Sequence, residues 1–338
     1  MKKITILLLV VSAFSCKNTQ NIASKNNSDP SKYIEKISEK NLKEMLYVIA
    51  SDEMEGRETG SKGQKKAGLY MIEQYKKNGT PFPKGATDYY QHIPASYLNA
   101  RRNENLQDSE NIWAYIEGSE KPDEVLVISA HYDHVGIQNG EIYNGADDDG
   151  SGTVALLEMA KAFAKAKKEG HGPKRSVLFL HVTGEEHGLH GSRYYSEHPL
   201  FPIANTIADI NIDMIGRRDV EHAKTNNYVY VIGANRLSSD LHNAVVSQNE
   251  KYIKIDLDFK FNDPKDPNHF YERSDHYNFA KHGIPAVFFF NGVHEDYHGK
   301  DDIAEKIEYD ALTKRTKLAF VVAWELANGA KRPIVDKK

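Results

Sequence analysis

The sequence predicts an α/β fold, with a mainly parallel, doubly wound sheet that carries helices on both faces. Short runs dense in apolar and β-branched residues, such as 124–130 and 176–182, are typical of strands buried on both sides. Amphipathic segments separate these runs, and strands that alternate with helices indicate parallel pairing. The 338 residues suit one large domain or two small ones, and no break in composition requires a second domain.

Residues 1–16 are predicted to be a targeting segment that lies outside the fold. Two lysines precede an apolar run, 4–11, that is too short to span a bilayer. Cys16 follows this run and resembles the lipidation site of a bacterial lipoprotein; it is the only cysteine, so no disulfide framework is expected. A cleaved signal peptide is the alternative. Both predict export, either to the cell envelope on a lipid anchor, in the periplasm or outer membrane, or as a secreted protein.

Residues 17–32 lack apolar periodicity and are rich in Asn, Ser and Lys, so we expect a flexible tether ahead of one domain over 33–332. Within that domain, helices are assigned to apolar residues at near-helical spacing and strands to short β-branched runs. The first half is expected to contain a helix around 41–49, a loop over 51–63, a helix over 64–77, a loop over 79–87, two strands within 89–116, and a strand over 124–130.

The second half of the domain repeats the alternation of strand and helix. Ser151 opens a helix that 170–173, with two Gly and a Pro, brings to an end. The remaining elements are expected as strands over 176–182, 207–215 and 228–232, a helix over 237–247, a strand over 285–290, and a closing helix over 305–328.

Three of the predicted strands end in side chains that bind metals. The strand over 124–130 leads to His131 and Asp133, the next leads to Glu185 and Glu186, and the third ends near Asp213. In an open α/β sheet, ligands bind in the crevice beyond the carboxyl ends of the strands. Imidazole and carboxylate groups together suit zinc or a similar divalent ion. The sequence therefore predicts a metal site at this end of the sheet.

A glycine-rich loop adds three consecutive carboxylates, Asp147, Asp148 and Asp149, shortly after the first of these strands. One carboxylate can bridge two ions. The formal net charge is −4 and the Lys and Arg residues are scattered, so the sequence does not predict the positively charged surface that binds nucleic acid.

The motifs HYDH, NGADDDGSG, TGEEHGLHGS, NIDMIG, YERSDHYNFA and HEDYHGKDD occur in this order. Together they resemble the co-catalytic dizinc exopeptidases, the family of bacterial leucyl aminopeptidase and aminopeptidase Y, over residues 40–330. The resemblance implies an aminopeptidase that hydrolyses peptide substrates with two Zn²⁺ ions. Co²⁺ and Mn²⁺ tolerate the same kind of ligands.

The resemblance also implies a ligand set of five residues. His131 and Asp213 would bind one metal, Glu186 and His298 would bind the other, and Asp148 would bridge them. It implies a cis peptide between Asp148 and Asp149.

Three further residues receive catalytic roles from the resemblance. Glu185 would be the general base, Asp133 would fix the orientation of the His131 ring, and Tyr271 would donate a hydrogen bond to the developing oxyanion. His294 is an alternative to His298 as a ligand. His134, His187 and His190 fall outside the ligand set.

Other functions remain as alternatives. The run Ser274, Asp275 and His276 could suggest a serine hydrolase, but no nucleophile elbow accompanies it. The same scaffold also serves glutaminyl cyclases, carboxypeptidases that act on acidic dipeptides, and binding modules that have lost their ligands. Side-chain selection is expected to depend on the loops 216–224 and 260–271, and no heptad seam predicts an oligomer.

Overall fold

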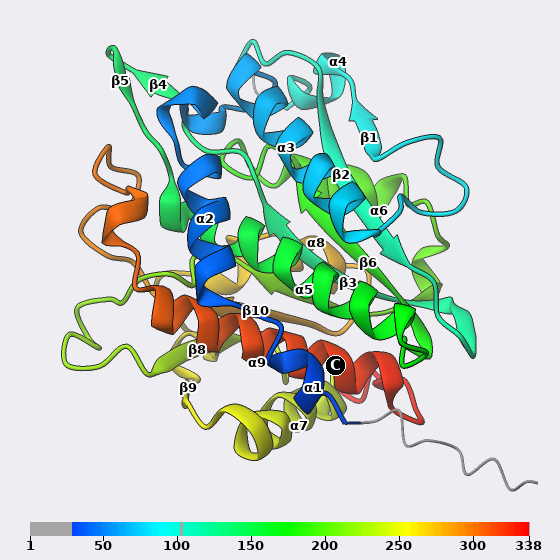
Figure 1. The fold of residues 1–338 in the computed structure, drawn as a ribbon. Coiled ribbons are helices and arrows are strands. Elements are labelled where there is room, and N and C mark those ends of the chain that lie inside the picture. The colour runs from blue at the N-terminus through cyan, green and yellow to red at the C-terminus, as the bar shows by residue number, and fades with distance from the viewer. Residues whose placement is uncertain (1–28, 102–103, 338) are drawn as a thin grey trace, which may run out of the picture.

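The computed structural model describes residues 29–101 and 104–337, so the predicted targeting segment, Cys16 and most of the predicted tether lie outside the described residues. The elements are an eight-stranded sheet, a small hairpin and helices on both faces of the sheet (Figure 1). The strands of the large sheet are β1 (Tyr90–Ile93), β2 (Ser109–Ile116), β3 (Lys121–His131), β6 (Arg175–Val182), β7 (Thr206–Ile212), β8 (Tyr228–Ile232), β9 (Asp256–Asp258) and β10 (Ala286–Phe290). The hairpin pairs β4 (Ile137–Gln138) with β5 (Glu141–Ile142).

The strand order is β1-β2-β6-β3-β7-β10-β8-β9. The four central strands β6, β3, β7 and β10 are parallel to one another, which confirms the predicted mainly parallel sheet. Their register places Ile128 of β3 opposite Phe179 of β6 and Ile210 of β7, all fully buried. The pairs β1-β2, β2-β6 and β10-β8 are antiparallel, a mixture that the sequence pattern did not predict.

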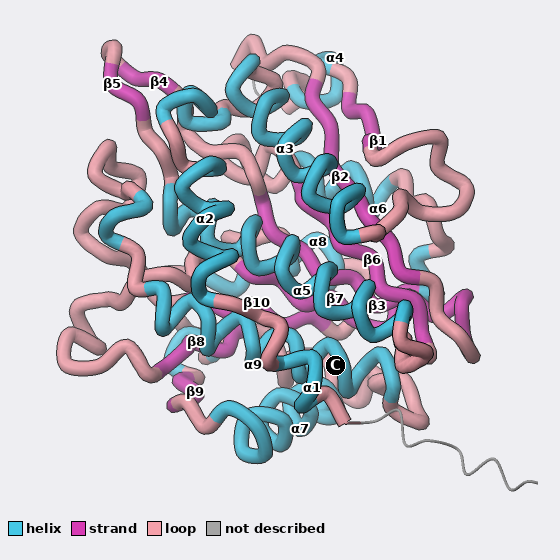
Figure 2. The backbone as a smooth tube through the Cα atoms, in the orientation of Figure 1, coloured by secondary structure: helices cyan, strands magenta, loops and turns pink. Residues whose placement is uncertain are grey.

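Helices cover both faces of the sheet, as the tube in Figure 2 shows. One layer contains α1 (Ser31–Ile34), α2 (Glu39–Ile49), α3 (Lys62–Asn78), α5 (Gly152–Lys168) and α9 (Tyr309–Asn328), with α7 (Ser239–Gln248) packed beside α9. The opposite face carries α6 (His190–Glu197) and α8 (His276–Ala280); the short α4 (Ala95–Leu98) lies near one edge. In the first layer Phe163 stacks on Trp324, with ring centroids 5.5 Å apart.

Local sequence signals explain where these helices begin and end. The hydroxyls of Ser38, Ser61 and Ser238 accept hydrogen bonds from backbone N–H groups in the first turns of α2, α3 and α7. Gly79 ends α3 in the left-handed conformation, with φ 74°. The turn α1 extends into the predicted tether, because the ring of Tyr33 stacks on Trp324 at 5.4 Å.

Two elements differ from the sequence prediction for clear physical reasons. Strand β7 ends at Ile212 rather than at residue 215, because the chain turns at Met214, where φ is +55°. Helix α6 was not predicted, because its buried residues are polar; Ser192, for example, donates a hydrogen bond to Asp275.

The parallel centre of the sheet brings the predicted functional segments to one end of the molecule. Strand β3 ends at His131, β6 is followed by Glu185 and Glu186, and β7 is followed by Asp213. Among the described residues, no helix has the length and apolar character needed to cross a membrane.

Candidate functional site

The loop that follows β3 is held by a buried arginine. Arg57 is fully buried, and its guanidinium donates hydrogen bonds to the carbonyl oxygens of Tyr132 (2.9 Å) and Gly145 (2.8 Å). It also donates to the carbonyl oxygens of Ile49 and Asn144, at 2.8 and 2.6 Å. Tyr132 follows His131, and Gly145 begins the carboxylate loop. One side chain therefore fixes both segments that deliver the predicted ligands.

The carboxylate loop is tied down by backbone hydrogen bonds to its flanks. The Asp302 carboxylate accepts from the N–H groups of Asp147 and Asp148, at 3.0 and 3.1 Å. Asp149 accepts from Met214 N–H at 3.0 Å. The peptide bond between Asp148 and Asp149 is cis, as the resemblance implied. Gly145 has φ +52°, and a Cβ atom there would lie 2.2 Å from the Asp148 carbonyl oxygen, so the turn requires glycine.

The five predicted ligands lie together in two groups that share Asp148. His131 Nε2 is 3.1 Å from Asp148 Oδ1 and 3.5 Å from Asp213 Oδ1. His298 Nε2 is 3.1 Å from Asp148 Oδ2 and 3.0 Å from Glu186 Oε2. The shared position of Asp148 is the one a bridging ligand needs.

Unpartnered oxygens show that this donor set fits divalent cations. Asp148 Oδ2 and Glu186 Oε1 are buried and accept no well-oriented hydrogen bond from the described residues. A buried carboxylate oxygen without a donor is costly unless a cation lies beside it. Imidazole nitrogens and carboxylate oxygens are the donors that zinc prefers. We conclude that the residues present fit two such ions.

The pKa shifts follow from this crowding of charge. Burial alone would raise the pKa of Asp148, but hydrogen bonds from His131 and His298 outweigh it and hold that pKa well below its ordinary value. Burial lowers the pKa of His298, yet the carboxylates of Asp148 and Glu186 raise it to about 10. Burial raises the pKa of the Glu185 carboxyl well above its ordinary value.

A sixth side chain, His134, joins the second group, although the sequence analysis placed it outside the ligand set. Its Nδ1 is 2.9 Å from Glu186 Oε1 and 3.7 Å from Asp148 Oδ2, and the ring is fully buried. The second group therefore offers two imidazoles, since His298 is also present with 40% of its side chain exposed. The sequence did contain a signal that could have identified His134 as part of the site, because it lies three residues after His131 in the same loop.

The other histidines lie outside both groups. His294 Nε2 is 3.2 Å from Asp147 Oδ2, so its ring packs against the neighbour of the bridging residue rather than against Asp148. His187 pairs with Glu104 at 2.7 Å, and His190 contacts Arg193. The geometry favours His298 over His294 as a ligand.

Asp133 supports the site differently from the expectation. The His131 ring donates from Nδ1 to the backbone carbonyl of Asp133 at 3.1 Å, while the Asp133 carboxylate is 3.8 Å away. That carboxylate instead accepts from Glu185 N–H at 3.2 Å and from the Thr59 hydroxyl at 2.9 Å. The main chain of Asp133 orients His131, and its side chain positions the backbone of Glu185.

The tyrosine nearest the metal ligands is Tyr297 and not Tyr271. Tyr271 packs against the guanidinium of Arg236, 4.5 Å from its ring centroid, and against His276. It does not line either of the pockets that contain Glu185, whereas Tyr297 lines both. Burial raises the pKa of Tyr297, and the carboxylates of Asp148 and Glu186 raise it further. These contacts favour Tyr297 over Tyr271 beside the carboxylates, and the oxyanion role of Tyr271 stays a prediction.

The run Ser274, Asp275 and His276 forms no serine nucleophile. Ser274 Oγ donates to Asp213 Oδ2 at 2.6 Å and accepts from Asn211 Nδ2 at 2.7 Å. Both ring nitrogens of His276 are buried without a hydrogen bond to a described residue.

A chain of polar contacts continues from Ser274 along β7. Ser129 Oγ on β3 lies 2.9 Å from Asp209 Oδ1 and 3.0 Å from Asn211 Oδ1, so it contacts both side chains. Asp213 is thereby connected to a buried polar row within the sheet.

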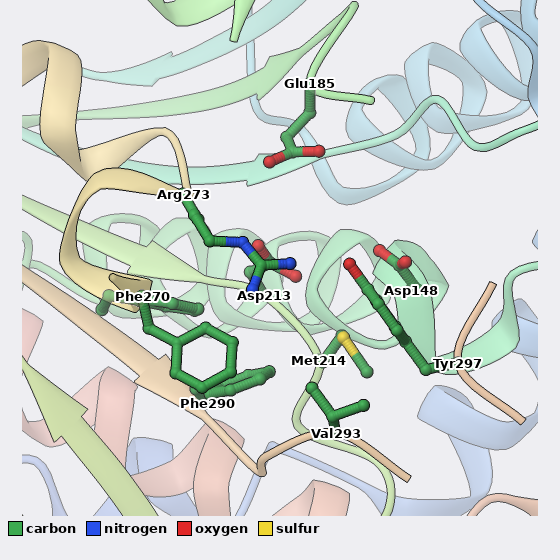
Figure 3. A pocket seen from close by; sticks show the side chains of 10 residues that line it. Asp148, Glu185, Asp213, Met214, Phe270, Arg273, Phe290, Val293 and Tyr297 are labelled. Atoms are coloured by element: carbon green, nitrogen blue, oxygen red, sulfur yellow. The ribbon is translucent and has the colours of Figure 1, made fainter. Parts of the chain in front are cut away.

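Beside the ligands is a pocket with both apolar and charged side chains in its lining (Figure 3). Glu185, Asp148 and Tyr297 point toward it from separate segments, as Figure 3 shows. Its apolar part consists of Met214, Phe270, Phe288, Phe290 and Val293. These five side chains give one part of the pocket an apolar wall next to the carboxylates.

Comparisons with known proteins bear on the family and the fold. A model of peptidase family M28 matches residues 111–323. A probable zinc metalloprotease of Pyricularia oryzae is 24% identical over 254 residues, which cover 64% of this chain and 50% of that protein. The chain thus spans about half the length of the curated relatives it matches.

Solved structures share the fold. The Legionella pneumophila LapA aminopeptidase superposes with a TM-score of 0.68 at 21% identity, covering 98% of this chain and 81% of that one. A Porphyromonas gingivalis glutaminyl cyclase superposes with a TM-score of 0.64 at 17% identity, covering 85% of this chain and 97% of that one.

Proposed function

Because the chain belongs to peptidase family M28, we propose that it is an exported aminopeptidase that releases N-terminal residues from peptides with the help of two zinc ions. The observation that carries the proposal is the pair of ligand groups that share Asp148, next to a pocket that contains Glu185.

In this proposal five residues would hold two zinc ions: His131 and Asp213 in one group, Glu186 and His298 in the other, and Asp148, which both groups share. When bound, the ions would lower the pKa of the attacking water and polarise the scissile carbonyl.

The protein's own residues move the proton. Glu185 accepts one proton from the attacking water as the water oxygen bonds to the carbonyl carbon. Glu185 then donates that proton to the nitrogen as the C–N bond breaks, so that the amine leaves neutral. Burial disfavours the charged form of Glu185 and raises its pKa, which strengthens it as a proton acceptor in the first step. The Tyr297 hydroxyl donates a hydrogen bond to the carbonyl oxygen as negative charge develops there.

The apolar pocket would take the side chain of the N-terminal residue. Three Phe rings, Met214 and Val293 form its wall, so we expect a preference for leucine-like and aromatic residues over charged ones.

Export and anchoring are proposals from the sequence alone, since Cys16 lies outside the described residues. We propose that Cys16 carries a lipid that holds the protein at the cell envelope. Metabolic labelling with a fatty acid, followed by fractionation of wild type and Cys16→Ser, tests this. Label on the wild type only, with the variant released to the soluble fraction, supports the anchor; equal labelling contradicts it.

The function is tested by metal analysis together with a panel of substrates. Two metals per chain, release of N-terminal residues that a chelator abolishes, and no cleavage of N-acetylated peptides would support the proposal. One metal per chain with loss of ammonia from N-terminal Gln would instead indicate a glutaminyl cyclase. Cleavage only at free C-termini would indicate a carboxypeptidase, and no turnover with ligand binding a binding module.

A further inference from the structure

A second pocket adjoins the apolar one, and the two share Glu185, Arg273 and Tyr297. Four cationic side chains line this second pocket: Arg101, Arg193, Arg273 and Lys281. Its only carboxylate outside the proposed machinery is the exposed Glu272. Cationic side chains therefore outnumber the three carboxylates of this lining, Glu185, Glu186 and Glu272, immediately beside the proposed general base.

These positive charges are only partly balanced within the protein. No ion pair between a carboxylate and Arg193, Arg273 or Lys281 is found among residues 29–101 and 104–337, although the charge of Glu197 acts on Lys281 and raises its pKa. Elsewhere on the same end of the sheet the contrast is clear, since Arg217 pairs with Asp296 at 2.9 Å. Unpaired cations that gather in one hollow, beside a reactive centre, indicate an anionic ligand.

Arg193 is the most firmly placed of the four. It lies on α6 with 7% of its surface exposed, and its guanidinium donates from Nε to the Tyr97 hydroxyl at 3.0 Å and from Nη2 to His190 Nδ1. Both neighbours are uncharged, because burial and Arg193 lower the pKa of His190 to about 4. Nη1 makes no hydrogen bond to a described residue, so it remains available to a ligand.

Lys281 contributes another positive charge to the lining of the same pocket. Its ammonium lies 5.0 Å from the ring centroid of Tyr277 and forms no ion pair with a carboxylate among the described residues. Burial lowers the pKa of Lys281, and the charges of Arg101 and Arg193 lower it further. A bound anion would relieve this repulsion.

We propose that this pocket binds a carboxylate on the part of the peptide that follows the scissile bond. The inference rests on the proposed function and names its substrate class: peptides with either a free α-carboxylate close to the cut, as in dipeptides and tripeptides, or an acidic side chain just after it. The amino terminus of a peptide is cationic and is repelled by this pocket, so the peptide lies with its first side chain in the apolar pocket.

The test compares matched substrates that differ in one charge. With the purified, metal-loaded full chain, kcat/KM is measured for Leu-Asp-amide against Leu-Asn-amide, and for Leu-Ala against Leu-Ala-amide. Charge-assisted hydrogen bonds to arginine predict a preference on the order of 10-fold to 100-fold for the charged member, mainly through KM. The first pair reports an acidic side chain and the second an α-carboxylate.

Two variants locate the effect. Arg193→Gln and Lys281→Gln each remove one charge from the pocket, and the preference is expected to fall by at least threefold in each. Lys281 is exposed, so its substitution leaves the core intact even where the buried Arg193 cannot be replaced. Lys168→Gln removes an exposed charge at the far end of α5 and is expected to keep the wild-type ratio.

The outcomes separate this inference from the proposed function. If Leu-Asn-amide and Leu-Ala-amide are cleaved but neither charged substrate is preferred, the inference is overturned while the aminopeptidase stands. A preference that persists in both pocket variants also overturns it. If none of the four substrates is cleaved, the proposed function itself fails. A preference in either pair that collapses in the variants supports the carboxylate site and identifies its source.

Discussion

Replacing Arg57 with lysine should weaken metal binding as well as the fold. Lysine keeps the positive charge but loses the planar fork with which Arg57 reaches four carbonyl oxygens, at 2.6 to 2.9 Å. An ammonium in the same space can reach one or two of them. At about 1 to 1.5 kcal/mol for each buried carbonyl that loses its donor, we expect a loss of roughly 3 kcal/mol in the free energy of unfolding.

Arg315 provides a matched control for this substitution. It is also buried and also donates to four carbonyl oxygens, those of Tyr228, Ile215, Arg217 and Asn226, at 2.6 to 3.2 Å. Of those residues only Ile215 lies near a proposed metal ligand, two positions after Asp213, whereas Arg57 binds the segments of both His131 and Asp148. Arg315→Lys should therefore cost a similar free energy of unfolding with a smaller effect on the metal site.

Two measurements distinguish the variants. Thermal unfolding of both proteins in chelator should show midpoints lowered by roughly 5 °C, given the unfolding entropy of a chain of this length. Competition for zinc against a chelator should show an affinity about 10-fold to 100-fold lower in Arg57→Lys, because His131 and Asp148 lose their common support. Equal zinc affinity in the two variants would refute the assignment of Arg57 as the residue that aligns these two segments.

Five other substitutions test the site and the fold. Glu185→Gln should keep both metals but lower kcat by at least about 10³-fold, because the proton acceptor is lost while the ligands stay; normal turnover would remove Glu185 from the mechanism. Asp148→Asn should reduce the metal content measured by elemental analysis, and full occupancy of both sites would exclude a bridging role. Tyr297→Phe should lower kcat by about 10²-fold with little change in KM, whereas Tyr271→Phe should stay within a few-fold of wild type; the reverse order would assign the oxyanion role to Tyr271. Burial lowers the pKa of His181 to about 3, so His181 takes up a proton more readily in the unfolded chain than in the folded one. The stability that a neutral His181 contributes is complete above pH 6.5 and is lost as the pH falls toward 3. Between pH 7 and pH 5, the free energy of unfolding of His181→Gln in urea should therefore fall by about 2 kcal/mol less than that of wild type, and an equal fall in both proteins would contradict a neutral His181.

The central strands and the ligand segments could be predicted because their signals are local. Residues 228–232 form β8 with the predicted bounds, since a run of β-branched and aromatic residues has few alternatives to a buried strand. His131, Glu186 and Asp213 follow such runs directly. Parallel strands then bring their carboxyl ends together without any further information.

The residues that the sequence missed depend on contacts made only in the folded chain. Arg57 is the last residue of the 3₁₀ helix Asp52–Arg57, and the four carbonyls that it binds come from three separate segments. The choice between Tyr271 and Tyr297 depends on which loop faces the pocket, and no periodicity reports that. The charges of the second pocket come from segments as far apart as Arg101 and Lys281.

The buried polar row along β7 also affects how this strand finds its native register with its neighbours during folding. Asp209, Asn211 and Asp213 alternate with Ile210 and Ile212, so the two sets point to opposite faces of the sheet. A slip of one residue during folding would push the carboxylates into the aliphatic layer and pull both isoleucines among polar groups. Mispaired chains would therefore be strongly disfavoured. The polar row that supports the metal ligand therefore also specifies the register of the strand.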